Sequence, residues 1–421
     1  MYQVSNSASL VRGHKRLLTR ERSTPRVSRT VVLLGLTSLF TDISSEMVVA
    51  VLPLYLVYIG GFSPLAFGLI DGLYQGATAF MGLLSGYLGD RKQRHKQVAV
   101  AGYGLSAVCK LLLATVGTAL SAIGAVVLLD RAGKGIRTAP RDAMISLSTP
   151  RSELGAAFGV HRALDTTGAM LGPLVAFGLL AIAPLAFNSV FVVSFCIALI
   201  GVGILVIFVQ PRTAKDAATD EAPRPSLRQA MGLVHKQSYR ALLLAGGALS
   251  LATASDAFIF LALQDAVDLG NSMFPLLFVG SATTYMLLAV PMGRLADQIG
   301  RGRVLLGGYV LLLTVYLLLL SPLGGWALLV AALGLLGMYY AATDGVLMAL
   351  GSAVAPDDIR GSGLALLRTV TSGARFAASL LFGLLWTLWG IDAAFGCFAA
   401  LLVAAMAAAA LILTRTPEAV T

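Results

Sequence analysis

Long apolar stretches alternate with short polar or glycine-rich connections along most of this chain. A helix that crosses a membrane needs about 20 mostly apolar residues, and each stretch is about that long. With glycine, proline and charged residues taken as boundaries, the pattern predicts twelve spans. They cover residues 31–59, 64–88, 97–117, 121–147, 155–182, 186–209, 240–266, 274–295, 304–322, 326–352, 361–388 and 391–414.

Two longer polar segments divide this pattern. Residues 1–30 form a basic tail before the first span, and residues 210–239 separate the sixth span from the seventh. The sequence therefore predicts one six-helix bundle over residues 31–209 and a second over residues 240–414, joined by a cytoplasmic linker. Residues 415–421 follow the last span as a short tail.

The composition is that of a membrane protein and excludes an ordinary soluble domain. Hydrophobic residues make up 57% of the chain and charged residues 12%, whereas soluble domains average about 25% charged residues. The three cysteines, Cys109, Cys196 and Cys397, lie in separate spans without the spacing of a metal site. We interpret them as packing residues.

The net charge of +10 predicts an orientation in the membrane. Cytoplasmic loops of membrane proteins are enriched in lysine and arginine. Here the loops after even-numbered spans and both tails carry these residues, whereas the loops near residues 60–63, 118–120 and 183–185 carry none. We therefore expect a protein of the cytoplasmic (inner) membrane with both termini in the cytoplasm. Topology, and not nucleic-acid binding, explains the positive charge.

A short motif, G-x-L-x-D with basic residues after it, occurs twice, about half a chain apart. The first copy contains Gly86, Asp90, Arg91 and Arg94, and the second contains Gly293, Asp297 and Arg301. Two copies of a motif separated by half of the chain indicate two copies of one structural unit. Its position between apolar spans is typical of transporters built from repeated helical bundles. Both copies are predicted on the cytoplasmic side, where we expect them to belong to a gate.

These loop motifs resemble the signature that the major facilitator superfamily carries between the second and third helices of each half. Arg131–Gly135 is similar to the R-x-x-x-G pattern of the family's fourth helix, and Gly168, Gly172 and Pro173 to the G-x-x-x-G-P pattern of its fifth. The resemblance implies an all-α polytopic membrane protein with twelve transmembrane helices in two pseudo-symmetric six-helix bundles. It also implies a monomer, and the G-x-x-x-G-P pattern is associated with antiport.

The fourth span departs from the family pattern because it is unusually charged. Residues Asp130–Asp142 read D-R-x-G-K-G-x-R-x-x-P-R-D, which resembles a prokaryotic subfamily of unknown substrate. Helical periodicity puts its charges in a stripe, and a charged stripe must line water or another helix and not lipid. We expect the deeper residues Asp130, Arg131 and Lys134 to face the substrate. The gate is expected to include Arg137, Arg141 and Asp142.

Ionisable side chains within the spans are the candidates for proton coupling. Asp42 and Glu46 share a face of the first span, and two close carboxylates readily share a proton. Alternatively, both accept hydrogen bonds from basic residues of the fourth span. Asp130 in that span and His161 and Asp165 in the fifth are further candidates. Histidine exchanges protons near neutral pH, although a lone buried histidine is more often structural.

The second half carries fewer charges. Its substrate candidates are Asp256 in the seventh span, Tyr340 and Asp344 in the tenth, and Arg368 and Arg375 in the eleventh. Arg162 of the fifth span is expected to be the pseudo-symmetric partner of Arg368 at the substrate, although it could also pair internally with Asp165. Asp344 could likewise pair with Arg375. We expect Asp71 and Lys110 to form a structural ion pair between the second and third spans.

These observations predict a proton-coupled secondary active transporter that moves a small molecule by alternating access, without a cofactor. The antiport pattern favours efflux. The alternative is a proton symporter that imports an organic anion or a metal chelate. Export of a metal ion is less favoured, because the chain has no histidine cluster. The motifs of zinc proteases, α/β-hydrolases and P-loop ATPases do not occur in the sequence, so we do not expect an enzyme.

Overall fold

The computed structural model describes residues 28–89, 95–150, 153–210, 232–355 and 360–414, and within these ranges all regular structure is helical. The first half contains α2 (Arg29–Leu54), the π-helical turn η1 (Tyr55–Ile59), α3 (Pro64–Gly89), α4 (His95–Thr115), α5 (Leu120–Leu147), α6 (Leu154–Ile182) and α7 (Phe187–Phe208). The second half contains the short turns η4 (Leu233–His235) and η5 (Asn271–Met273), and α9 (Gln237–Leu251), α10 (Asp256–Val267), α11 (Pro275–Ile299), α12 (Arg301–Leu319), α13 (Gly325–Val354), α14 (Arg360–Trp389) and α15 (Ile391–Thr414).

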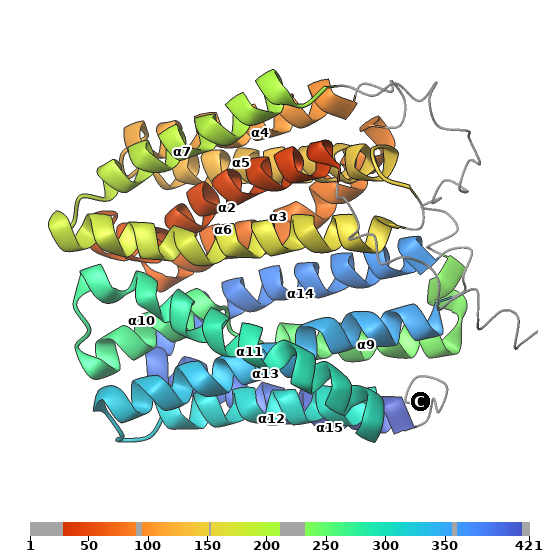
Figure 1. The fold of residues 1–421 in the computed structure, drawn as a ribbon. Helices are drawn as coiled ribbons and strands as arrows, with labels where there is room; N and C mark the ends of the chain where they lie inside the picture. Colours follow the sequence, from red (N-terminus) through yellow and green to blue (C-terminus); the bar gives the residue numbers. More distant parts are fainter. Residues whose placement is uncertain (1–27, 90–94, 151–152, 211–231, 356–359, 415–421) are drawn as a thin grey trace, which may run out of the picture.

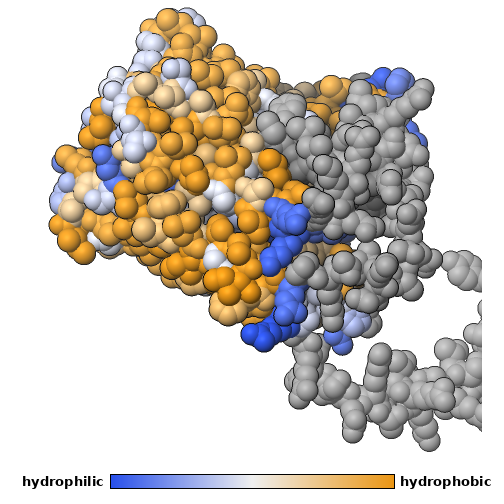
Figure 2. Space-filling model, turned by 90° about the horizontal axis from the view of Figure 1, so that it is seen from above, coloured by the Kyte–Doolittle hydropathy of each residue, from blue (hydrophilic) through white to orange (hydrophobic). Residues whose placement is uncertain are grey.

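Each predicted span corresponds to a helix or to a pair of consecutive helices, so the all-α polytopic fold is confirmed. Nine helical spans in the described ranges are long and apolar enough to cross a membrane. The other three predicted spans are α3, α5 and α14. Helix α5 is less apolar because Asp130, Arg131 and Lys134 lie near its middle. Figure 2 shows a broad hydrophobic face, with the most strongly hydrophilic residues gathered toward one end.

The two halves repeat the same packing scheme. Helix α2 packs against α6 and α7, as α9 packs against α14 and α15. Helix α5 packs against α3 and α4, as α13 packs against α11 and α12. The halves meet where α3 contacts α14 and where α6 contacts α11. Figure 1 shows them as two adjacent groups of nearly parallel helices, which is the pseudo-symmetric arrangement that the repeated motif predicts.

Two ends of this bundle are distinguished below. The terminal end is where α2 begins and α15 ends, and the loop end is where α6 leads into α7 and α12 into α13 (Figure 1). At the loop end an aromatic cluster closes the contact between the halves. The ring of Phe258 on α10 lies 4.9 Å from that of Phe67 on α3, and 4.6 Å and 5.7 Å from those of Phe382 and Trp386 on α14, between ring centroids.

The predicted seventh span is broken in the structure. Helix α9 ends at Leu251 and α10 begins at Asp256, with four non-helical residues between them. Tyr316 holds this break: its hydroxyl accepts a hydrogen bond from the Ala254 amide at 2.7 Å and donates to the Ala252 carbonyl at 3.3 Å. The backbone groups freed by the break are thereby bonded within the protein, as a membrane interior requires.

Small residues let α6 approach α2 closely. A Cβ atom added at Gly172 would lie 2.7 Å from the Ile43 carbonyl oxygen and 2.8 Å from Cβ of Glu46, and one added at Gly168 would collide with the Leu39 carbonyl. Pro173 follows inside the same helix. The G-x-x-x-G-P segment therefore sets the spacing between α2 and α6, two helices that carry candidate functional residues.

Candidate functional site

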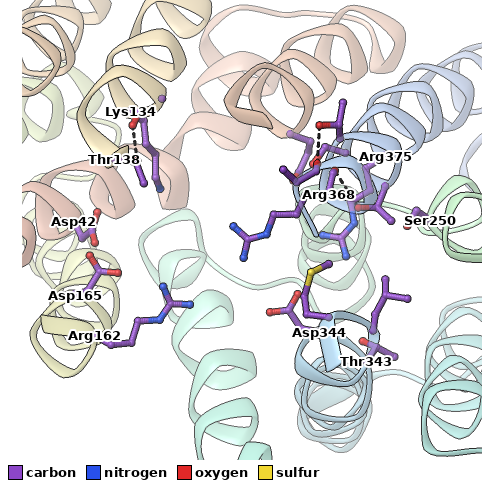
Figure 3. A pocket seen from close by; sticks show the side chains of 18 of the residues that line it. Asp42, Lys134, Thr138, Arg162, Asp165, Ser250, Thr343, Asp344, Arg368 and Arg375 are labelled. Atoms are coloured by element: carbon purple, nitrogen blue, oxygen red, sulfur yellow. Dashed lines mark hydrogen bonds between the residues drawn. The ribbon is translucent and has the colours of Figure 1, made fainter. Parts of the chain in front are cut away.

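A cavity of about 540 Å³ lies between the two halves. It is lined by residues from helices of both halves and includes positions near the terminal end, such as Arg141 on α5 and Met348 on α13. Figure 3 shows Asp42, Lys134, Arg162 and Asp165 on one side and the second-half residues on the other. Its charged lining residues are six basic and three acidic: Lys134, Arg137, Arg141, Arg162, Arg368 and Arg375, with Asp42, Asp165 and Asp344.

Two carboxyl groups of the first half face each other in this cavity. Asp42 on α2 lies opposite Asp165 on α6, close enough for the two side chains to interact (Figure 3). Each also has a distant arginine partner on α5: Asp42 lies 3.9 Å from Arg137, and Asp165 lies 3.9 Å from Arg141. Arg141 makes a shorter ion pair, 2.9 Å, with Asp142. The carboxyl pair therefore joins two helices and is not fully neutralised by cations.

This pair differs from the one expected from sequence. Asp42 and Glu46 do lie one turn apart, but Glu46 does not line the cavity, and its Cβ packs near Gly172. Arg162 also does not pair with Asp165, since Arg141 takes that position. The sequence could not show this, because spacing relates residues of one helix and the observed pair joins two helices.

His161 lies beside the cavity and is buried. Its Nε2 is 3.0 Å from the Ser38 hydroxyl, which in turn is 3.3 Å from the Tyr103 hydroxyl. Arg141 Nη1 approaches the same serine at 3.5 Å. His161 is thus part of a chain of hydrogen bonds that connects α2, α4, α5 and α6 at the edge of the charged region.

Asp130 and Arg131 are placed away from the cavity, contrary to the expectation for substrate residues. Asp130 accepts from Lys110 Nζ at 2.7 Å and also pairs with Arg131. The Arg131 guanidinium lies 3.9 Å above the ring of Tyr74 on α3. All three charged residues are nearly inaccessible, so they form an internal ion network that ties α3, α4 and α5 together. The expected ion pair between Lys110 and Asp71 is therefore wrong, because Lys110 pairs with Asp130 instead.

The second half contributes three charged residues to the cavity. Arg368 and Arg375 extend from α14 and Asp344 from α13 (Figure 3). Among the described residues, no ion pair within 4.0 Å joins Asp344 to Arg375. Asp256 and Tyr340 lie outside the cavity and bond to each other, with the tyrosine hydroxyl donating to the carboxylate.

The proposed gate residues are described only in part. Asp90, Arg91 and Arg94 lie outside the described residues, and Gly86 lies near the end of α3. In the second copy, Gly293 and Asp297 lie on α11, and Arg301, the first residue of α12, bonds to Asp297 at 3.1 Å. Arg137 and Arg141, expected at the gate, line the cavity itself.

Several cavity residues were not singled out from the sequence because they are uncharged. They are Gln75, Thr138, Ser250, Tyr309, Thr343 and Thr371. Hydroxyl and amide groups are common in transmembrane helices, where many bond to their own backbone, as Thr138 does to the Lys134 carbonyl. Only the tertiary arrangement distinguishes those that line the cavity.

A polytopic helical bundle with two repeated halves and a charged cavity between them is the architecture of a membrane transporter. The family model of the Major Facilitator Superfamily matches residues 34–274 and 242–421. The chain belongs to this superfamily.

Relatives and solved structures agree with this assignment. An uncharacterised MFS-type transporter of Methanocaldococcus jannaschii is 33% identical over 377 residues, covering 86% of this chain and 89% of the relative. The solved structure of the nucleoside transporter NupG has a TM-score of 0.77 at 16% identity and covers 92% of this chain and 99% of its own. An inward-facing bacterial homologue of the lysosomal transporter Spinster has a TM-score of 0.73 at 12% identity, covering 95% and 99%. At these identities the two structures show the fold alone.

Proposed function

We propose that this transporter moves a small anionic solute and couples its movement to protons. The observation that carries the proposal is the charge of the cavity, six basic residues against three acidic ones. Arg137 and Arg141 lie near carboxylates, whereas Lys134, Arg162, Arg368 and Arg375 make no ion pair with another described residue. Such an excess of cations favours an anion in the cavity.

The sequence alone left this question open, because acidic and basic residues are similarly numerous in the spans. In the structure, Glu46, Asp130 and Asp256 lie outside the cavity lining. Removing these three from the count shifts the balance of the cavity toward positive charge. A metal cation fits this cavity poorly, and no group of three or more His, Cys, Asp or Glu side chains comes together in the described part of the chain.

Proton coupling is proposed for the Asp42–Asp165 pair. With both carboxyl groups ionised, Arg137 and Arg141 are attracted to them, and the two negative charges repel each other. A proton on the pair removes this repulsion and weakens the attraction between the carboxyl groups and the two arginines. The positive charge of Arg137 and Arg141 is then available to bind the solute anion. Arg137 Nη1 has no hydrogen-bond partner among the described residues, so this guanidinium has a donor to spare for a carboxylate or a solute anion.

The direction of transport is proposed from the α2–α6 contact. The G-x-x-x-G-P segment lies at this contact and favours antiport, and therefore efflux in exchange for protons. The coupling proposed above favours the second candidate, import of an organic anion by proton symport, because a proton on Asp42–Asp165 strengthens anion binding and the two would then move together. The charge distribution predicts that both termini lie on the cytoplasmic side of the inner membrane. In that orientation the cavity lies toward the cytoplasm, and the aromatic cluster closes the side that faces away from it. The protein is proposed to act as a monomer without a cofactor.

The purified protein in detergent tests the anion proposal. A panel of small organic anions and phosphate esters is screened for thermal stabilisation, with matched neutral and cationic compounds. At least one anion class should stabilise the protein, and Arg162→Ala or Arg368→Ala should raise its half-maximal concentration roughly tenfold, since a lost charged hydrogen bond costs about 1.5–3 kcal/mol. Arg303→Ala, on the exposed surface of α12, is the matched control. Stabilisation by cations alone would overturn the proposal.

Proteoliposomes test coupling and direction with an anion found in this way. A proton gradient should drive its movement, and inverting the gradient should invert the direction. Asp42→Asn and Asp165→Asn should each abolish gradient-driven transport while exchange of labelled for unlabelled solute continues. Full gradient-driven transport by both variants would remove this pair as the coupling site.

A further inference from the structure

A second pair of carboxyl groups meets across the two halves, on the loop-end side of the cavity. Asp71 lies on α3 of the first half, and Asp256 is the first residue of α10 in the second half. Both line a separate small cavity of about 80 Å³, together with Gln75 and Tyr74. They are near enough for their charges to interact. Neither residue lines the large cavity.

The two carboxyl groups are held by hydroxyl donors from the second half. Asp71 Oδ2 accepts from the Ser379 hydroxyl on α14 at 2.6 Å, a bond that crosses between the halves. Asp256 Oδ1 accepts from the Tyr340 hydroxyl on α13 at 2.5 Å. One helical turn away from Asp71 the halves are again in contact, because a Cβ added at Gly68 would collide with the Ser379 carbonyl. The pair therefore belongs to the closed contact between α3 and α14.

Burial disfavours a negative charge on both carboxyl groups, but the interactions that offset this cost are concentrated at Asp256. Asp256 lies in the first turn of α10, where the helix dipole stabilises an anion, and the charge of Arg375 on α14 acts on it. Asp71 accepts from a neutral hydroxyl and makes no ion pair with a described residue.

Among the described residues that line the small cavity with Asp71, none carries a positive charge. Its small cavity is otherwise lined by apolar side chains of α2, η1, α3, α10 and α11. The nearby Arg131 lies over the ring of Tyr74 and forms its ion pair with Asp130, not with Asp71. An ionised carboxylate is costly in such a position, and a neighbouring carboxylate adds repulsion.

We propose that Asp71 carries a proton while the loop end is closed, and that the Asp71–Asp256 pair releases it when the halves separate there. In the closed state the proton removes the repulsion between the two carboxyl groups and the cost of desolvating a second charge. In the open state both groups become hydrated, so both ionise. Low pH on the loop side therefore favours the closed loop end. This proton site is distinct from the proposed Asp42–Asp165 pair, and it rests only on the alternating-access part of the proposed function.

Distance measurements by double electron–electron resonance test the proposal. Spin labels are placed at Ile182→Cys and Leu323→Cys, two exposed loop-end positions in different halves. The native cysteines are first replaced, and the protein is reconstituted in lipid nanodiscs. Across a pH series on both sides of neutrality, the wild type should shift from short to long distances as the pH rises. Asp71→Asn, which mimics a permanent proton, should lose this response and remain at short distances.

Two further variants and one spectroscopic measurement distinguish a proton on the Asp71–Asp256 pair from a general effect of pH or salt on the protein. Asp256→Asn should also weaken the response, whereas Asp392→Asn, an exposed carboxylate at the same end, should leave it unchanged. In infrared spectra, the carbonyl band of a protonated carboxyl group should be present in the wild type at neutral pH and reduced in Asp71→Asn. An unchanged pH response in Asp71→Asn, or a distance change that follows sodium concentration and not pH, would overturn the proposal. This readout needs no transported solute, so it is independent of the anion assignment.

Discussion

Helices α5 and α13 occupy equivalent positions in the two halves, yet their chemistry differs. Helix α5 carries six charged residues between Asp130 and Asp142, whereas Asp344 is the only charged residue of α13. Each packs against two neighbouring helices in the same way. The two halves therefore share the arrangement of their helices but not their charged residues. On our proposal, coupling depends on the charge-rich half, while solute binding uses arginines of both halves.

The largest expected effect comes from breaking the internal network of α5. Asp130→Asn would leave Lys110 and Arg131 without their counter-charge in a nearly inaccessible region. Removal of one partner of a buried ion pair costs about 3–5 kcal/mol. Asp344→Asn on α13, an exposed cavity residue, should change stability by about 0.5 kcal/mol or less. Equilibrium unfolding in mixed detergent micelles measures both.

A second substitution distinguishes a lost pair from a general defect of α5. Lys110→Met in the Asp130→Asn background removes one of the two stranded cations and should recover part of the lost stability, since contacting residues are not additive. If Asp130→Asn and Asp344→Asn lowered the free energy of unfolding equally, the ion network around Asp130 would not stabilise α5. The difference in charge between α5 and α13 would then have no effect on stability.

The sequence was sufficient for the framework, because each helix carries its own signal. Apolar stretches of membrane length located all twelve spans, and the repeated motif gave the two halves. The break before Asp256 was not predicted, since residues 252–255 read A-T-A-S within an apolar segment and contain neither glycine nor proline. What holds the break open is Tyr316 on another helix.

The site was harder to predict because its pairs join different helices. Periodicity relates Asp42 to Glu46 but has no information about Asp165, which faces Asp42 from α6. The same limit explains Lys110 on α4. Helix α4 packs against α5, which carries the observed partner Asp130, whereas α3, which carries the expected partner Asp71, packs against α5 and α14. The charged residues themselves were found from the cost of charge in a membrane; their partners depend on how the helices rotate against one another.

A smaller effect is expected from the helix contacts that differ between the halves. Gly172→Ala would place a methyl group 2.7 Å from the Ile43 carbonyl, between α6 and α2. At Gly246 on α9, in the equivalent helix pair, the nearest atom to an added Cβ is 3.5 Å away. Overpacking costs about 1–3 kcal/mol, so Gly172→Ala should lower stability by about 2 kcal/mol, with little change for Gly246→Ala.

The measurement is again equilibrium unfolding, with Gly178→Ala as the control for helix propensity. Gly178 lies on α6 with no atom within 4 Å of an added Cβ. Alanine there should be neutral or stabilising by up to about 1 kcal/mol. If Gly172→Ala behaved like Gly178→Ala, the close approach of α2 and α6 would not depend on the G-x-x-x-G-P segment.

The smallest effect is expected at the second copy of the repeated motif. Asp297 and Arg301 form an ion pair at 3.1 Å, but their side chains are 66% and 31% exposed, unlike the network around Asp130. Exposed pairs contribute about 0–1 kcal/mol, because water screens the charges and two long side chains lose freedom. Arg301→Ala should therefore lower stability by about 0.5 kcal/mol or less, and added salt should reduce even that difference. A loss comparable with that of Asp130→Asn would mean that the motif stabilises the fold directly, which would contradict our expectation that this copy belongs to a gate.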